Sequence, residues 1–350
     1  MTEIDLSYGD LDTKTLASVV TDHASVVSLD LSGNQIPAEA LIEIVDTHIC
    51  RMVNLETLDL KANKIGPRGA EHLCKALIQH CPKLRYLDLN ENGILNEALF
   101  HLAYLLQGNR IESLLLVSNH LTPRGIPTLC DGLLLNRHIR ELVLAFNVLG
   151  DTGASTIAKA LADHPSLQLL DISDNRISDL GAVDIAEHLI LSPLSHLDSL
   201  NLSVNSIGDV GFTAIAEAVA RTRNRRLRHL DLGCNAEVGP MGRRALIAHV
   251  ASMRHLKSLG LCSCNLSDED ALSLTVAVLC DGCGITSIEG FNNPEMLPKT
   301  ERALDEALKL KRIKRLSDKK RECQYSLVAS IVLGAAVVVG IRVALRHWWR

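Results

Sequence analysis

Apolar residues recur along this chain in a short pattern, Leu-x-x-Leu-x-Leu-x-x-Asn, in which apolar and polar positions alternate at the centre. The clearest copy runs from Leu55 to Ile65 as LETLDLKANKI. Its apolar positions cannot lie on one face of a helix, whereas Leu58 and Leu60 alternate as a short strand requires. Asn63 then marks a turn. Because a single strand of this length cannot bury its apolar side, we expect the copies to stack on one another.

Ten copies of the pattern follow one another at intervals of 27 to 30 residues. Their last positions are Asn34, Asn63, Asn92, Asn119, Asn147, Asn175, Asn205, Asn235, Cys264 and Asn293. Between one such position and the next strand lies a second segment, such as GDTGA from Gly150 to Ala154, followed by apolar residues at helical spacing. Four of these segments carry an aspartate that we expect in the first turn, where a negative charge favours the helix dipole. These residues are Asp151, Asp179, Asp209 and Asp268.

The repeated strand, turn and helix resemble the leucine-rich repeat family, in its long-repeat, ribonuclease-inhibitor-like subtype. The resemblance covers about residues 1–298. It implies an α/β fold, a horseshoe-shaped solenoid with a parallel sheet on its concave face and helices on its convex face. We expect about ten full repeats after an N-terminal cap. This cap is Met1 to Leu11, in which Ile4 and Leu6 take the strand positions and Gly9 stands where Asn is expected.

Charge divides the chain into two parts. The sequence has 350 residues and a formal net charge of −5. Residues 299–350 hold 13 Lys or Arg and 5 Asp or Glu, which leaves 23 basic and 36 acidic residues for 1–298. An acidic solenoid is therefore expected to carry a basic C-terminal segment. The sequence lacks the phosphate-binding P-loop, the HExxH zinc motif and the GxSxG nucleophile motif, and we expect neither catalytic residues nor a cofactor.

The ten cysteines fit structural roles better than a metal site. Cys74 and Cys130 fall where other repeats have a small helix residue facing the core. Four others form the spacing C-x-C then C-x-x-C, at Cys262, Cys264, Cys280 and Cys283. The repeat register places these four on the concave face, in the interior and at the end of a convex helix. They are then too far apart to share one tetrahedral ion, so we predict no metal.

The concave face is the predicted binding surface. One residue of each strand projects outward at its centre, and these residues are acidic in most repeats, as at Asp59, Asp88 and Asp171. In two neighbouring strands apolar residues replace the acid. The predicted partner-binding residues are Leu115, Val117, Val143, Ala145 and Phe146, flanked by Tyr86, Asp88 and Asp171. A contiguous group of exposed apolar residues often marks a binding site, although acidic concave residues are common in the family and the group could instead be sheltered.

Residues 299–323 are predicted to form an amphipathic helix that caps the last repeat and continues as a basic segment. Ala303, Leu304, Ala307, Leu308 and Leu310 share one face of this helix. Its continuation holds eight basic residues between Lys309 and Arg321. A charged run of this kind is often only a solvated segment or a nucleic-acid patch, but its apolar neighbour indicates a membrane and no nucleic acid.

That neighbour is a predicted transmembrane tail anchor over residues 325–345, followed by a short basic tail at 346–350. The stretch from Tyr325 to Ile341 has no charged residue, and Arg342 can snorkel so that the span continues to Leu345. Tyr325 on one side and Trp348 and Trp349 on the other suit the two membrane interfaces. Basic residues before the span predict that the solenoid faces the cytosol and contacts anionic lipid. The short, moderately apolar span favours the mitochondrial outer membrane over the peroxisome or the endoplasmic reticulum.

Two functions are compatible with these features. The first is a non-enzymatic scaffold or adaptor that binds a cytosolic protein with a basic surface through its concave face. The alternative is a GTPase-activating regulator similar to the leucine-rich repeat activators of Ran. The stretch from Cys81 to Ile94 resembles a strand and turn of that group, with Asn90, Asn92 and Gly93 at the matching positions. The acidic C-terminal segment of that group is replaced here by basic and apolar residues.

Overall fold

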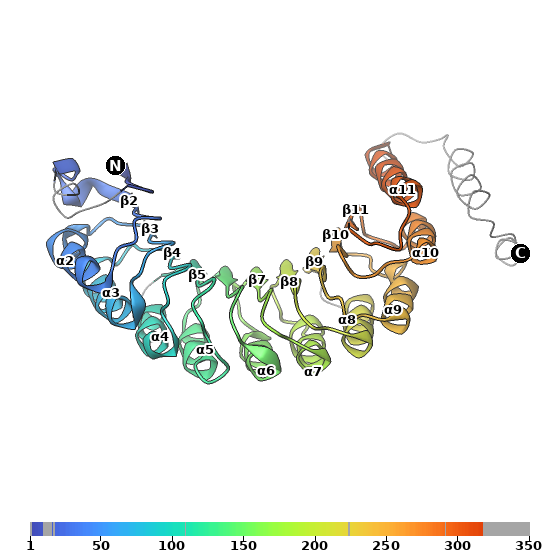
Figure 1. Ribbon diagram of the computed structural model, residues 1–350, viewed down its shortest axis with the longest axis horizontal. Helices are drawn as coiled ribbons and strands as arrows, with labels where there is room; N and C mark the ends of the chain where they lie inside the picture. Colours follow the sequence, from blue (N-terminus) through green and yellow to red (C-terminus); the bar gives the residue numbers. More distant parts are fainter. Residues whose placement is uncertain are drawn as a thin grey trace, which may run out of the picture.

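The computed structural model describes residues 2–9, 16, 18–108, 110–222, 225–290 and 292–317. These residues form an arc with the strands along its inner edge and the helices along its outer edge (Figure 1). The strands are β1 (Thr2–Asp5), β2 (Val26–Asp30), β3 (Thr57–Asp59), β4 (Tyr86–Asp88), β5 (Ser113–Leu115), β6 (Glu141–Val143), β7 (Leu169–Asp171), β8 (Ser199–Asn201), β9 (His229–Asp231), β10 (Ser258–Gly260) and β11 (Ser287–Glu289). The predicted α/β solenoid is confirmed.

Helices or helical turns separate the strands on the convex side. They are η1 (His23–Ser25), α2 (Ala38–Thr47), η2 (Ile49–Arg51), α3 (Gly66–His80), η3 (Asn96–Ala98), α4 (Leu99–Gly108), α5 (Ile126–Leu135), α6 (Gly150–Leu161), α7 (Asp179–Asp184), η4 (Ile185–Ile190), α8 (Asp209–Arg221), α9 (Pro240–Val250), α10 (Asp268–Leu279) and α11 (Pro298–Ser317). Of these, η4 is a π-helical turn that continues α7. The buried leucines and isoleucines between the two layers form one continuous aliphatic core.

The strands form one parallel sheet in the order of the sequence, from β1 to β11. Equivalent positions of neighbouring repeats pair directly, as in Leu58 with Leu87 and Asp59 with Asp88. Each strand therefore adds one step to rows of side chains that run along the concave face. The predicted register is correct, because a slip by one residue would have exchanged the buried and exposed faces.

Buried asparagines join each repeat to the one before it. Asn147 Nδ2 donates to the carbonyl oxygens of Leu116, Leu144 and Ala145, and its Oδ1 accepts from the backbone N–H groups of Asn119 and Leu121. Equivalent bonds to the preceding repeat are made by Asn63, Asn119, Asn175, Asn205, Asn235 and Asn293. At the exceptional repeat, the Cys264 thiol donates to the Leu232 carbonyl at 3.2 Å.

The first-turn aspartates connect successive helices. Asp151, Asp179, Asp209 and Asp268 do lie in first turns, as predicted from the sequence. Each carboxylate also accepts from the backbone at the start of the next helix. Asp179 Oδ1, for example, accepts from Gly208 N–H and Gly211 N–H at 2.8 Å each. A Cβ on Gly211 would lie 2.8 Å from that oxygen, so glycine is needed where the two helices meet.

Helix α11, the last helix in the described residues, packs beside α10 at the end of the arc (Figure 1). Leu304, Ala307 and Leu308 are buried there, on the apolar face that the sequence pattern predicts. Two basic residues that were predicted to belong to the juxtamembrane segment instead form hydrogen bonds with the backbone of the solenoid. Lys311 is buried and its Nζ donates to the Val278 carbonyl, whereas Arg312 Nε donates to the Thr286 carbonyl at 2.7 Å.

Within the part of the chain that the structure describes, no helix combines the length and apolarity needed to cross a membrane. The predicted span at 325–345 and its flanking residues Tyr325, Arg342, Trp348 and Trp349 lie outside the described residues. The same holds for the tail at 346–350 and for the basic residues after Ser317.

Candidate protein-binding surface

The central row of the concave face changes from acidic to apolar and back again. In register from β2 to β7 its residues are Asp30, Asp59, Asp88, Leu115, Val143 and Asp171. The row continues through Asn201, Asp231, Gly260 and Glu289 on β8 to β11. Only two adjacent strands of this row carry apolar side chains, which is the order that the sequence predicts.

Leu115, Val117, Val143 and Phe146 are the apolar residues exposed at this place, and we refer to them as the central patch. The first three are partly buried, and Phe146 is 56% exposed. Phe146 lies in the turn before Asn147 with φ of +55°. The residue before each of the other repeat asparagines also has a positive φ. Ala145 was predicted to contribute, but it is buried at 5% exposure, because its methyl group is shorter than the side chain of the partly exposed Val117 at the equivalent position of the preceding repeat. Its side chain therefore offers little contact surface.

Carboxylates and a tyrosine border the central patch on its N-terminal side. Tyr86 hydroxyl lies 3.4 Å from Asp88 Oδ2, and Asp88 Oδ1 accepts from Asn90 N–H at 2.8 Å. Burial raises the pKa of Asp88 to about 6, with the nearby Asp59 carboxylate adding to the shift. Burial also raises the pKa of Asp59 and, together with these carboxylates, that of Tyr86. A cation placed here would relieve the repulsion between the carboxylates.

The C-terminal side and lower border of the patch are polar as well. Asp171 Oδ1 accepts from the backbone and hydroxyl of Ser173, and its Oδ2 accepts from Asn201 Nδ2 at 3.0 Å. On the row below, Ser113 hydroxyl donates to Glu141 at 2.6 Å. The apolar group is therefore enclosed by hydrogen-bonded polar side chains, which is the usual anatomy of a small protein-binding hot spot.

The three residues that resemble the activators of Ran have roles within the fold. Asn92 is one of the repeat asparagines and donates to the carbonyls of Leu60 and Asn90. Asn90 Oδ1 accepts from Val117 N–H at 2.6 Å, which supports the central patch. Gly93 occupies a turn position with φ of +62°. The positions of these three residues are thus explained by the repeat fold, without a role in GTPase activation.

The cysteines lie where the repeat register predicts. Cys74 and Cys130 are buried helix residues, and burial raises the pKa of each thiol to about 12. Cys262 lies on the concave side, Cys264 is buried in the core and Cys280 follows α10. No group of three metal-ligand side chains within reach of one ion includes any of these thiols in the described residues.

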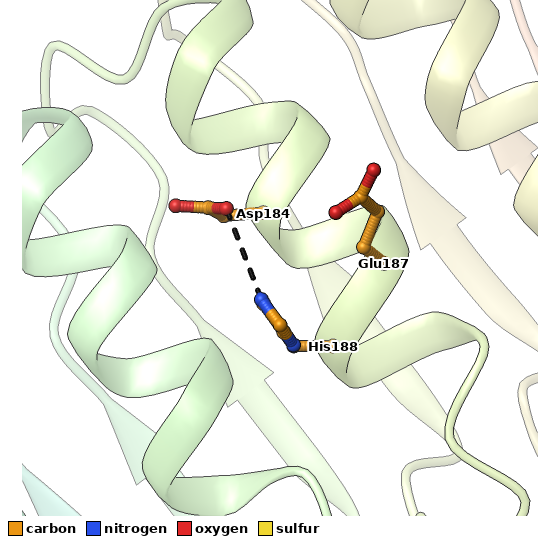
Figure 2. Close-up of side chains that lie close together, drawn as sticks. All are labelled: Asp184, Glu187 and His188. Atoms are coloured by element: carbon orange, nitrogen blue, oxygen red, sulfur yellow. Dashed lines mark ion pairs between the residues drawn. The ribbon is translucent and has the colours of Figure 1, made fainter.

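One cluster of metal-ligand side chains occurs on the convex side, at Asp184, Glu187 and His188 (Figure 2). His188 Nε2 lies 3.9 Å from Asp184 Oδ1, and Lys159 Nζ lies 3.7 Å from the other Asp184 oxygen. All three cluster residues come from one helical surface that solvent reaches. Because Asp184 already forms an ion pair with Lys159 at the surface, we assign no metal to this cluster.

A polar hollow on the concave face was not predicted from the sequence. It spans β8 to β11, has a volume of about 180 Å³ and is lined by Ser199, Leu200, Asn201, His229, Leu230, Asp231, Ser258, Gly260 and Glu289. Its cause is Gly260, which supplies no side chain to the central row. The signal that could have revealed it is the glycine in a row whose residues are otherwise mostly acidic.

A leucine rich repeat family model matches six segments of the chain, residues 52–74, 80–103, 135–158, 163–186, 194–216 and 223–246. These segments coincide with the stacked strand and helix units described above. The chain contains leucine-rich repeats. Two curated relatives agree with this assignment and a solved structure shares the fold.

The first relative is mouse ribonuclease inhibitor, 33% identical over 137 residues, or 38% of this chain and 30% of the inhibitor. The second is human NACHT, LRR and PYD domains-containing protein 5, 35% identical over 92 residues, or 26% of this chain and 8% of the relative. The leucine-rich repeat chain thus matches less than a third of either relative. A chain of the yeast Rad7 and Elc1 complex has a TM-score of 0.55 at 15% identity, covering 81% of this chain and 67% of that one.

Proposed function

We propose that this leucine-rich repeat protein is a non-enzymatic scaffold or adaptor that binds a protein partner through the central patch. The observation that carries the proposal is the replacement of carboxylates by Leu115 and Val143 on two adjacent strands of the concave row. A repeat scaffold presents such a surface without further rearrangement. The names of ribonuclease inhibitor and of the Rad7 and Elc1 complex indicate proteins that bind other proteins, which supports this class of function.

The partner is expected to combine an apolar contact with a basic border. Full burial of a Leu, Val or Phe side chain stabilises by about 1.5–3 kcal/mol, and the patch side chains are already partly buried before binding. The remaining gain is therefore modest, and charge must contribute to specificity. Asp59, Asp88, Glu141 and Asp171 surround the patch. Basic residues on the partner would meet these groups and would accelerate association at low salt.

The test replaces Leu115 and Val143 together by Asp in the full-length chain. Both side chains are partly exposed, so stability should change little, whereas a charge buried under the partner should weaken binding by about 2–5 kcal/mol. The matched control is Leu180→Asp with Val210→Asp, the same residue types on the neighbouring convex helices α7 and α8. These two side chains are 74% and 61% exposed.

The measurement is quantitative affinity purification of each tagged variant from cells, normalised to the wild-type protein. Partners that bind the concave face should be depleted with the Leu115 and Val143 variant and retained with the convex control. If both double variants fold and recover the same proteins in the same amounts, the concave patch is not the binding surface.

We also propose that the solenoid is displayed to the cytosol from a membrane, through a single span at 325–345. The support is the uncharged stretch from Tyr325 to Ile341 and the basic residues on both sides of it. Release of the full-length protein by carbonate extraction would contradict membrane insertion. Protease digestion of tags at both ends, in intact organelles, would contradict the topology.

The organelle we propose is the mitochondrial outer membrane, because the span is short and moderately apolar. The expected result is co-localisation of the full-length protein with an outer-membrane marker in fluorescence microscopy. Replacement of Arg342, Arg346 and Arg350 by Ser should redirect the protein to the endoplasmic reticulum if those charges carry the selection. A peroxisomal pattern for the wild-type chain would overturn this assignment. An unchanged pattern for the Ser variant would contradict the role of the three arginines.

A further inference from the structure

The polar hollow lies on the same concave face as the central patch, on the strands that follow it. Asp231 and Glu289 belong to the central row and stand on either side of Gly260 in the pairing of β9, β10 and β11. A Cβ on Gly260 would lie 2.0 Å from Asp231 Oδ1, so the Asp231 carboxylate extends over the vacant position. The missing side chain and the inclined carboxylate together make the hollow.

The lining of the hollow matches a cation that donates several hydrogen bonds. Its ionisable side chains are Asp231, Glu289 and His229, and the other polar groups include the hydroxyls of Ser199 and Ser258. His229 Nε2 lies 3.9 Å from Asp198, which also pairs with Arg228 at the edge of the sheet. The imidazole thus lies near a carboxylate at the edge of the sheet, and Asp231 and Glu289 are the two acidic side chains of the hollow.

The dimensions suit an arginine side chain. Neighbouring strands lie about 4.8 Å apart, and the Asp231 carboxylate lies over Gly260, so it faces the Glu289 strand across about one such interval. A planar guanidinium presents donors on two sides and can pair with both carboxylates, whereas an ammonium group is a compact point charge. The volume of about 180 Å³ accommodates a long side chain together with water.

We propose that the partner segment bound at the central patch continues across the strands and places an arginine side chain between Asp231 and Glu289. This inference rests on the proposed function, because it takes the patch as the first anchor. From Val143 on β6 to Gly260 on β10 there are four strand intervals, or about 19 Å. An extended chain covers that distance in about six residues. The predicted recognition element is an apolar anchor followed, or preceded, by arginine about six residues away.

The test uses a phage-displayed library of random 16-residue peptides and the full-length protein in mild detergent. Binders of the wild-type chain are counter-selected against the Leu115→Asp, Val143→Asp variant, so that the peptides kept depend on the central patch. Each selected peptide is then synthesised with arginine and with its neutral analogue citrulline. Fluorescence anisotropy gives the two dissociation constants.

Selected peptides should carry arginine five to seven residues from their apolar anchor, and citrulline should weaken binding about tenfold. Asp231→Asn and Glu289→Gln should remove that difference. The matched control is Asp30→Asn, in the same row on β2. Asp30 and Asp231 each accept a 2.8 Å bond from the backbone two residues later, which asparagine oxygen can also accept.

The outcomes separate the two proposals. Patch-dependent peptides that bind the Asp231→Asn and Glu289→Gln variants as tightly as the wild-type chain would overturn the arginine site and leave the central patch in place. Patch-dependent peptides that lack the spaced arginine would also overturn the arginine site. This outcome is expected if the hollow binds another class of ligand. A selection without any patch-dependent peptide would overturn both proposals.

Discussion

The repeat asparagine at Asn147 offers a direct measure of what holds the binding surface in place. Its side chain is 5% exposed and fixes the turn that displays Phe146. In Asn147→Ala the backbone N–H groups of Asn119 and Leu121 lose the acceptor recorded for them, and the Leu116 carbonyl loses its donor. The carbonyls of Leu144 and Ala145 keep other partners, from Asn175 and Ser118.

Three buried backbone groups are thus left without their partner. Each such group costs about 1–3 kcal/mol, so Asn147→Ala should lower the free energy of unfolding by about 3–9 kcal/mol. The matched control is Asn34→Ala in the first of these turns. Asn34 Nδ2 donates to three carbonyls, but its Oδ1 accepts from no group in the described residues. The control should therefore cost about 2–6 kcal/mol less, because no N–H group loses an acceptor.

Two measurements on the full-length protein in mild detergent examine this prediction. Urea unfolding followed by circular dichroism gives the loss of stability for each variant. Hydrogen exchange read by mass spectrometry should show faster exchange in β5, β6 and β7 and little change in β10, since each repeat contacts only its neighbours. Equal costs for Asn147→Ala and Asn34→Ala, or a cost below about 1 kcal/mol for the former, would refute the hydrogen-bond account.

Three further predictions concern buried groups. Because the folded-state pKa of Asp88 is raised to about 6, the folded chain binds this proton more tightly than the unfolded chain. Urea unfolding should therefore show the free energy of unfolding decreasing by roughly 2 kcal/mol as pH rises from 4 to above 6. Asp88→Asn should remove that part of the pH dependence. Cys74, whose pKa burial raises to about 12, should resist iodoacetamide in the folded chain while the exposed Cys234 is alkylated, as followed by mass spectrometry; equal labelling would contradict the buried position. Arg243 Nε and Asp270 pair at 2.8 Å with both side chains about 9% exposed, so Arg243→Ala should cost about 3–5 kcal/mol in thermal or urea unfolding, and an unchanged midpoint would refute the pairing.

Much of the candidate site follows from the period of the repeat alone. Side chains alternate between the two faces of a strand, so the pattern around Leu58 and Leu60 decides which residues enter the core. The constant spacing then aligns equivalent positions of successive repeats. These two local rules were sufficient to place Leu115 and Val143 next to each other between Asp88 and Asp171.

What the sequence by itself determined is therefore the solenoid, its register and the order of side chains along the concave row. The tertiary structure decided the contacts between repeats, because these join residues 25 to 33 positions apart that no local pattern links. It showed that Asp179 accepts hydrogen bonds from the start of the following helix, that Ala145 is buried and that Lys311 of α11 bonds a carbonyl of α10. It also revealed the hollow at Gly260, since an absent side chain has a consequence only once its neighbours are placed around it.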